Sequence, residues 1–181
     1  MTIPAGSYTF GPSNGTLCVR TGRTGAAAKA GHNLLLHVTS WKATLVVVDV
    51  ASASIELEVD GASLRVRQGT GGMQALGDDD RENIEQTIDD DVLKRQSIVF
   101  RSTAVERAGD GLSVRGDLAL LGTTRPIGFA VALADDGTLT AVATVKQTDW
   151  GIKPYSTLFG ALKVVDEVEV SLSAPLPAQS V

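Results

Sequence analysis

The chain has 181 residues, of which 43% are hydrophobic and only 4% aromatic, so it can form one domain, residues 1–181, with a large aliphatic core. The formal net charge is −5, and the chain lacks the one-sided basic surface that displaces counterions from nucleic acid, which excludes nucleic acid as a partner. Its single cysteine, Cys18, excludes an intrachain disulfide and two-cysteine redox motifs.

The N-terminal segment MTIPAGSYTF lacks the basic start and long apolar stretch of a secretory signal peptide. The longest apolar run near the front, Ala43 to Val50, is interrupted by Thr44 and Asp49 and is too short to cross a bilayer as a helix. We therefore expect a cytoplasmic protein that does not span a membrane. A secreted protein whose signal had been removed would show the same pattern.

Much of the first third of the chain alternates between apolar and polar residues, which is the period of a half-buried β-strand. The clearest case lies from Ser54 to Val59, where Ile55 and Leu57 are flanked by polar residues. Asp60-Gly61 follows, a dipeptide that is typical of a hairpin turn. On this pattern we predict strands at Gly6–Phe10, Gly15–Arg20, Asn33–Asp49 with a bend near Thr39–Trp41, Ser54–Val59 and Ala62–Arg67.

The alternation stops in Gln68–Gly77, which contains four glycines and is expected to be a loop. Ile84, Ile88 and Val92 then recur every four residues, which predicts one helix of about three turns. Asp79 and Glu82 have the spacing of a capping box, so we place the start of the helix near them.

Eight acidic residues lie between Asp78 and Asp91. A calcium-binding EF-hand loop requires glycine at its sixth position, and counting from Asp78 that position is Asn83. The acidic run is therefore interpreted as the solvated face of the helix.

Alternation resumes after the helix and continues nearly to the end of the chain. Gly122 to Pro126 is interpreted as a turn, because glycine permits unusual backbone angles and proline is tolerated best where a strand begins. Asp149–Leu162 has no regular period, so we expect an irregular segment there. The predicted strands are Ser97–Val105, Leu112–Leu121, Pro126–Ala134, Thr138–Gln147 and Glu167–Ser173.

These patterns together predict an all-β protein with one inserted short helix. Consecutive strands joined by short turns pair antiparallel. Closing such a sheet into a barrel removes its edges, and a barrel of about eight strands leaves room for one small ligand.

The residue types that carry catalysis or bind metals show no recognisable arrangement. His32 and His37 lie five residues apart, so on a strand they point to opposite faces and cannot chelate one ion together. The glycines of Gly69–Gly72 lack the Gly-Lys-Ser/Thr ending of a phosphate loop, and no nucleophile, base and acid show triad spacing. We predict no catalytic residue, no metal site and no required cofactor.

The positive signal is a continuous apolar face that lies in phase on several strands. Small residues such as Ala141 and Ala143 share this face and would leave space inside a closed sheet. A solidly packed barrel interior would give the same pattern. The residues of the face are Ile55, Leu57, Phe100, Leu118, Leu120, Ile127, Phe129, Val131 and Val145.

An aliphatic cavity would suit a long hydrocarbon chain. Burial contributes about 0.8 kcal/mol per CH₂ group, so three or four isoprene units would gain about 12 kcal/mol before ordering costs of several kcal/mol. Micromolar affinity requires only about 8 kcal/mol, so a charged anchor for the ligand is not needed.

The segment VRGDLALLGTTRPI, from Val114 to Ile127, is the most distinctive in the chain. It is accompanied by SIVFRST at Ser97–Thr103, TDWGI at Thr148–Ile152, VVDEVEV at Val164–Val170, GHNLLL at Gly31–Leu36 and DDDREN at Asp78–Asn83. Together these segments resemble the YceI-like family, lipocalin-shaped proteins that bind polyisoprenoids. The first four are similar to that family's VxGxLTIxGVTRPV, ITFxST, DFGI and GDEVxI motifs, with Trp150 in place of the phenylalanine of DFGI.

The resemblance implies an eight-stranded, antiparallel, lipocalin-like barrel, a buried isoprenoid or quinone-like lipid, frequent homodimers and a connection with stress responses. We therefore expect non-enzymatic binding or carriage of such a lipid. We expect Trp41, Trp150 and Phe159 at the wet rim of the cavity, where amphipathic rings are suited. Contact with the lipid chain inside is expected from Leu57, Phe100, Leu118, Leu120, Phe129, Val131 and Val145.

Two other hypotheses remain open from the sequence. One is an enzyme, such as a cyclase or isomerase of an apolar substrate, in which His32, Asp149 or Asp166 supplies a titratable group inside the barrel. The other is an interaction module whose barrel is solidly packed. A continuous cavity would argue against the second of these.

Overall fold

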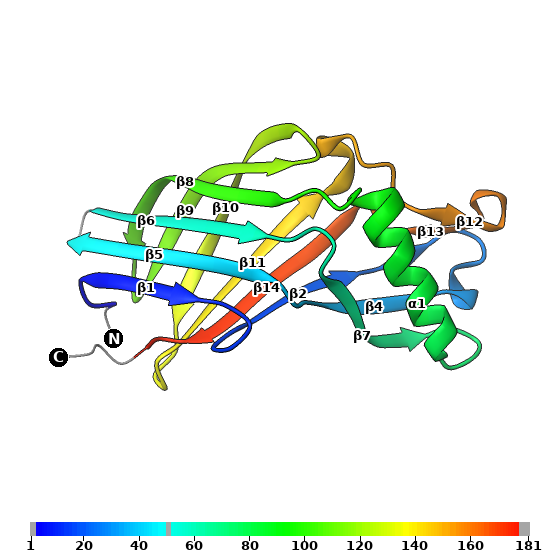
Figure 1. Ribbon diagram of the computed structural model, residues 1–181, viewed down its shortest axis with the longest axis horizontal. Coiled ribbons are helices and arrows are strands. Elements are labelled where there is room, and N and C mark those ends of the chain that lie inside the picture. Colours follow the sequence, from blue (N-terminus) through cyan, green and yellow to red (C-terminus); the bar gives the residue numbers. More distant parts are fainter. Residues whose placement is uncertain (1–2, 50–51, 178–181) are drawn as a thin grey trace.

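The computed structural model describes residues 3–49 and 52–177. An antiparallel sheet curls around an apolar interior, and one α-helix lies at one end of it (Figure 1). The strands of this sheet, in its spatial order, are β1 (Gly6–Phe10), β5 (Trp41–Asp49), β6 (Ser52–Val59), β8 (Ile98–Ala108), β9 (Gly111–Leu120), β10 (Thr123–Leu133), β11 (Thr138–Lys146), β14 (Glu167–Pro175), β2 (Thr16–Thr21), β4 (His32–Val38) and β7 (Leu64–Gly71).

A smaller sheet and several helical turns complete the described structure. The helix α1 spans Asp78–Thr87 and continues into a π-helical turn, η2 (Ile88–Val92). The smaller sheet contains β12 (Ser156–Thr157), β13 (Leu162–Val164) and β3 (Arg23–Thr24), and the remaining turns are η1 (Ala28–Ala30), η3 (Gln147–Trp150) and η4 (Leu158–Gly160).

Three pairs of strands in the large sheet are halves of longer, bent strands. β4 continues into β5 through Thr39 and Ser40, and the pairs β1/β2 and β6/β7 hydrogen-bond along its two sides. With these three continuations merged, the 11 strands become eight long ones. β14 pairs with β2, the second half of the long strand that begins with β1. The last long strand of the order therefore pairs with the first. The prediction of an all-β, antiparallel, barrel-like fold with one short helix is confirmed.

The turn at Asp60–Gly61 is a bend within a long strand, so the predicted hairpin is wrong. β6 pairs with β5 and β7 pairs with β4, so the two strands that flank the turn do not pair with each other. Backbone hydrogen bonds from Thr39 N to Ser63 O (2.9 Å) and from Asp60 N to Ser40 O (3.0 Å) join this bend to that of the neighbouring strand.

Two predicted boundaries also differ from the structure. β7 continues through Gly71 into the predicted loop, where it pairs with β4. β10 begins at Thr123 instead of Pro126, because Leu121 and Gly122 alone make the turn, with φ of 51° and 75°. The predicted helix is confirmed, but its start is capped differently, since Gly77 N donates to the Asp80 carboxylate (3.1 Å).

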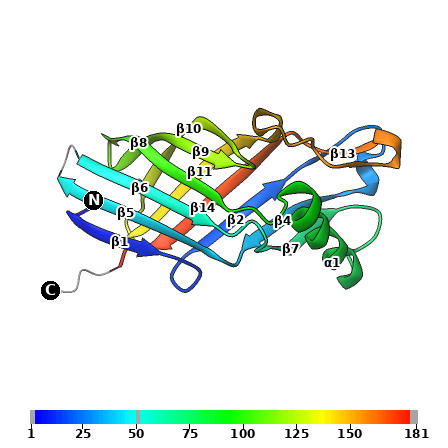
Figure 2. The ribbon, with the colours of Figure 1, turned by 45° about the horizontal axis from the view of Figure 1, so that its top comes forward.

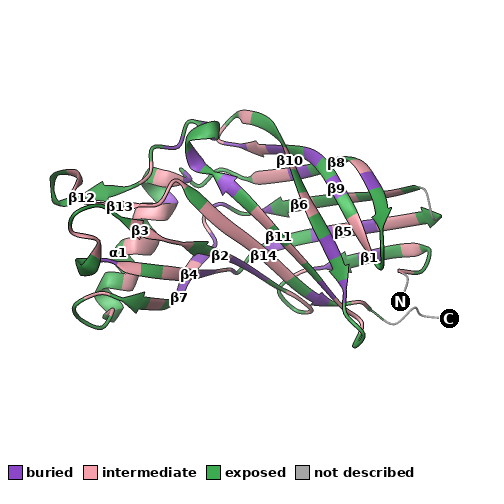
Figure 3. Ribbon diagram, turned by 180° about the vertical axis from the view of Figure 1, so that it is seen from behind, coloured by how far each residue is buried: buried purple, intermediate pink, exposed green. Residues whose placement is uncertain are grey.

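The core follows the alternation of the strands, as the striped burial in Figure 3 shows. Phe100 and Phe129 lie side by side in it, with ring centroids 5.3 Å apart. The Phe100 ring occupies the space beside Gly116, where an added Cβ would lie 2.5 Å from Phe100 Cζ. The absence of a side chain at Gly116 therefore positions an aromatic pair of the core.

Helix α1 packs across β7 at one end of the barrel (Figure 2). Glu85 Oε1 accepts a hydrogen bond from Val66 N (2.8 Å), and Arg81 Nη1 donates to the carbonyls of Val66 (3.2 Å) and Arg67 (3.3 Å). Asp89, which is buried at the end of the helix, pairs with Arg65 at 3.4 Å. These contacts hold the apolar face of the helix toward the interior.

Burial raises the pKa of the Cys18 thiol, and the nearby Arg20 charge opposes this only in part. An unfolded cysteine loses its proton near a pKa of about 8.5, where the folded thiol keeps it. Above that pH the unfolded state binds fewer protons than the folded state does, so the free energy of unfolding should fall as the pH rises. Urea unfolding between about pH 7 and 9.5 should show this fall, and a Cys18→Ala variant should lack that component. An identical pH dependence in both proteins would contradict the prediction.

Candidate binding cavity

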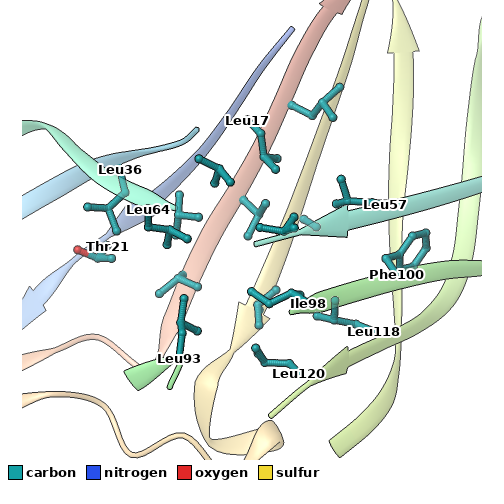
Figure 4. A pocket seen from close by; sticks show the side chains of 18 of the residues that line it. Leu17, Thr21, Leu36, Leu57, Leu64, Leu93, Ile98, Phe100, Leu118 and Leu120 are labelled. Atoms are coloured by element: carbon teal, nitrogen blue, oxygen red, sulfur yellow. The ribbon is translucent and has the colours of Figure 1, made fainter. Parts of the chain in front are cut away.

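An apolar cavity of about 430 Å³ lies inside the sheet. This volume falls within the range of about 300–1,000 Å³ that is typical of small-molecule sites. In Figure 4, Leu57, Phe100 and Leu118 lie on one side of this space and Leu36 and Leu64 on the other, and all five line the cavity. The interior is therefore not solidly packed, which argues against the hypothesis of a solid interaction module.

The described residues that line the cavity include no Asp, Glu, Lys, Arg or His. Thr21 carries the only oxygen among the labelled side chains of Figure 4. The described part of the wall thus offers a ligand neutral hydrogen-bonding groups and no ionic partner. Its polar residues are Thr21, Thr44, Asn83, Thr87, Gln147 and Tyr155.

The mouth of the cavity lies between α1 and the segment that precedes β12. Asn83 on α1 and Tyr155 before β12 both line the cavity and are both exposed to solvent. Val164 of β13 lies beside Tyr155, since its N–H donates to the Tyr155 carbonyl (2.9 Å), and it also lines the cavity. A ligand head at this position would meet a phenol and a carboxamide.

The apolar face predicted from the sequence lies on the cavity wall. The strand alternation brings all nine of its residues inward, including Ile55 and Ile127. The predicted lipid-contacting residues on the wall are Leu57, Phe100, Leu118, Leu120, Phe129, Val131 and Val145.

None of the three aromatic residues predicted at the rim is among the residues that line the cavity, and burial of Trp41 and Trp150 corrects the expectation for these two. Trp150 is 4% exposed, and its Nε1 donates to the Leu118 carbonyl (3.0 Å), so its polar edge is satisfied inside the protein. Trp41 is 7% exposed, and its Cη2 lies 3.0 Å from the position that a Cβ on Gly15 would take. Phe159, in contrast, is fully exposed at the turn between β12 and β13.

The titratable groups considered for catalysis lie outside the cavity wall. His32 Nε2 lies 2.9 Å from the Gln74 carbonyl, and Asp149 is exposed. Asp166 accepts hydrogen bonds from the Thr148 hydroxyl (2.6 Å) and N–H (2.9 Å), which hold the pKa of this carboxyl below its usual range. A carboxylate of lowered pKa is a weaker base, which makes Asp166 a poor candidate for a general base.

Within residues 3–49 and 52–177, no three His, Cys, Asp or Glu side chains gather as a metal ion would require. The same part of the chain contains no helix long and apolar enough to cross a membrane.

Part of the wall was not assigned from the sequence. β2 and β4 contribute one group of wall residues, and α1 with η2 contributes another. The sequence contains patterns that indicate both groups, since Leu34, Leu36 and Val38 alternate as on a strand and Ile84 and Ile88 recur at helical spacing. Neither pattern shows that the helix closes an end of the barrel. The wall residues concerned are Leu17, Val19, Leu34, Leu36, Val38, Ile84, Ile88, Val92 and Leu93.

Residues 15–176 match the family model described as the YceI-like domain. Among solved structures, the chain is similar to BcnA of Burkholderia cenocepacia, with a TM-score of 0.62 and 17% identity, covering 88% of this chain and 94% of that one. It is also similar to the YCEI protein of Campylobacter jejuni, with a TM-score of 0.54 and 13% identity, covering 83% and 86%. Identities this low show a shared fold. No curated protein matches the chain.

Proposed function

Because the chain belongs to the YceI-like family and encloses an uncharged apolar cavity, we propose that it binds or carries a long apolar lipid without catalysing a reaction. The lipid is of the isoprenoid or quinone-like class, with its hydrocarbon chain inside the barrel. The observation that carries the proposal is the cavity of about 430 Å³ whose wall is formed almost entirely by aliphatic and aromatic side chains.

The chemistry of the wall supports a lipid whose head is neutral. Each buried CH₂ group contributes about 0.8 kcal/mol, so the chain alone can supply micromolar affinity. Tyr155 and Asn83 at the mouth can hydrogen-bond to a quinone carbonyl or an alcohol. A phosphate head inside the cavity would be desolvated beside a wall whose described residues include no cation, which is unfavourable.

Extraction of the purified protein with organic solvent, followed by mass spectrometry, should release an isoprenoid or quinone-like lipid in stoichiometric amount. The delipidated protein should then take up farnesol, which native mass spectrometry detects as a complex. A preparation that releases no such lipid, and that takes up no farnesol after delipidation, would contradict the proposed function.

The homodimer that the family resemblance implies, and the cytoplasmic location, stay predictions. Light scattering during gel filtration measures the first, and fractionation of the source cells measures the second.

A further inference from the structure

One short segment of the protein exposes unusually large apolar side chains. Six large hydrophobic residues of the described chain are at least half exposed, and three of them, Tyr155, Leu158 and Phe159, lie within five consecutive residues. Phe159 is 112% exposed relative to its reference state, so its ring packs against no other side chain of the described residues. Clustered exposed apolar side chains are typical of an interaction site.

The backbone of this segment is strained where the apolar side chains are presented. Leu158 and Phe159 have φ of 52° and 55°, in the left-handed region that residues other than glycine rarely adopt. Such backbone persists at a cost in stability and is found most often at binding sites and switches. A strained turn that carries an unpacked aromatic ring points to binding outside the molecule.

The charge around this turn is opposite to that of the whole protein. Residues 22–31 and 152–165 carry Arg23, Lys29, Lys153 and Lys163 and no acid, a local charge of +4, whereas the chain as a whole has −5. The two segments are joined by pairing of β3 with β13 and by a hydrogen bond from Ala27 N to the Ala161 carbonyl (2.8 Å). The exposed ring is therefore set in a basic surface.

The Lys163 side chain lies close to the tip of this turn. Its Cε is 3.6 Å from the position that a Cβ on Gly160 would take, directly after Phe159 in the chain. Lys29, Lys153 and Lys163 are exposed. Aromatic rings with flanking lysines are the combination that enters the interface of an anionic bilayer.

The position of the turn favours a membrane as the partner. Figures 1 and 2 show the β12–β13 hairpin projecting beyond α1, at the end of the molecule opposite both termini. Because the hairpin projects further than α1, it would contact a flat membrane surface before the acidic residues of α1 do. Tyr155 and Val164, at the base of the hairpin, belong to the mouth of the cavity.

We propose that the β12–β13 hairpin docks on the surface of an anionic bilayer through Leu158 and Phe159. Docking brings the mouth of the cavity against the bilayer, so that a lipid passes between membrane and cavity without crossing water. The passage of lipid rests on the proposed function, whereas docking itself does not.

Flotation with two kinds of vesicle tests the docking. One kind contains phosphatidylcholine alone, and the other contains an equal amount of phosphatidylglycerol as well. The native protein should partition onto the anionic vesicles, and Phe159→Ser should lower its partition coefficient at least about tenfold. The double variant Lys153→Gln/Lys163→Gln should lose binding to anionic vesicles, and raised salt should weaken native binding.

Val48→Ser and Lys42→Gln are the matched controls, because both residues are exposed on β5, away from the hairpin, and should leave flotation unchanged. Farnesol uptake in solution should be unaffected by Phe159→Ser, since Phe159 does not line the cavity. A native protein that takes up farnesol but does not float would overturn docking and leave the proposed function standing. Docking would also be overturned if Phe159→Ser floated as well as the native protein. A dimer that depends on Phe159, in a protein that does not float, would overturn docking too.

Discussion

Replacing Ala143 with phenylalanine should lower the affinity for farnesol at least about tenfold, or about 1.4 kcal/mol. Ala143 lies on β11 with its side chain on the cavity wall. A phenyl ring there would occupy the space that the hydrocarbon chain requires. Since the ring enters a cavity and not a packed core, the melting temperature should stay the same or rise.

Val142→Phe is the control for this variant, because Val142 is the preceding residue of the same strand and is 52% exposed on its outer face. It adds an aromatic ring to β11 and should leave farnesol binding unchanged. Titration calorimetry and thermal unfolding of both variants measure the two effects. If Ala143→Phe bound farnesol as tightly as the native protein, the lipid would have to bind elsewhere. If Ala143→Phe does not fold, the smaller substitution Ala143→Leu tests the same prediction.

The second large effect is expected at Gly116, where alanine should lower the free energy of unfolding by about 3 kcal/mol. A Cβ at this position would lie 2.4 Å from the Arg101 carbonyl oxygen and 2.5 Å from Phe100 Cζ. The backbone oxygen cannot move without breaking the pairing of β8 with β9, and the Phe100 ring is held beside Phe129. Urea unfolding measures the loss.

Gly128→Ala is the matched comparison, since Gly128 lies on the adjacent strand β10 and its added Cβ would come no closer than 3.5 Å to Val114 O. This substitution should be neutral or should stabilise the protein by about 0.5 kcal/mol, because alanine lowers the entropy of the unfolded chain. Equal destabilisation by both substitutions would show that loss of glycine itself, and not the close contact, causes the effect.

Alternation of apolar and polar residues predicted most of the strands and the part of the cavity wall that lies on β6 and β8–β11. Leu118 and Leu120 on one strand and Phe129 and Val131 on the next were placed on one face by their period alone, and the structure lines the cavity with all four. This succeeds because successive side chains of a strand must point to opposite faces. The existence of a cavity cannot be predicted from this alternation, because strands around a filled core have the same period.

Long-range contacts account for the parts that could not be predicted. The Asp60-Gly61 dipeptide indicates a turn, but whether the chain reverses there depends on the partner strand, which is the bent β4–β5. The amphipathic indole of Trp150 suits a wet rim as well as a buried site. The structure shows it buried, because its N–H donates to the carbonyl of Leu118, 32 residues away in the chain. Neither partner is visible in the local sequence.

The contacts of α1 with β7 have a consequence for self-assembly. β7 ends the strand order of the described large sheet, and an unpaired strand edge can template β-pairing between molecules. Glu85 and Arg81 occupy the Val66 N–H and the carbonyls of Val66 and Arg67, the groups that a foreign strand would use. The helix at the end of the barrel therefore also covers this part of the β7 edge against pairing with a strand of another molecule.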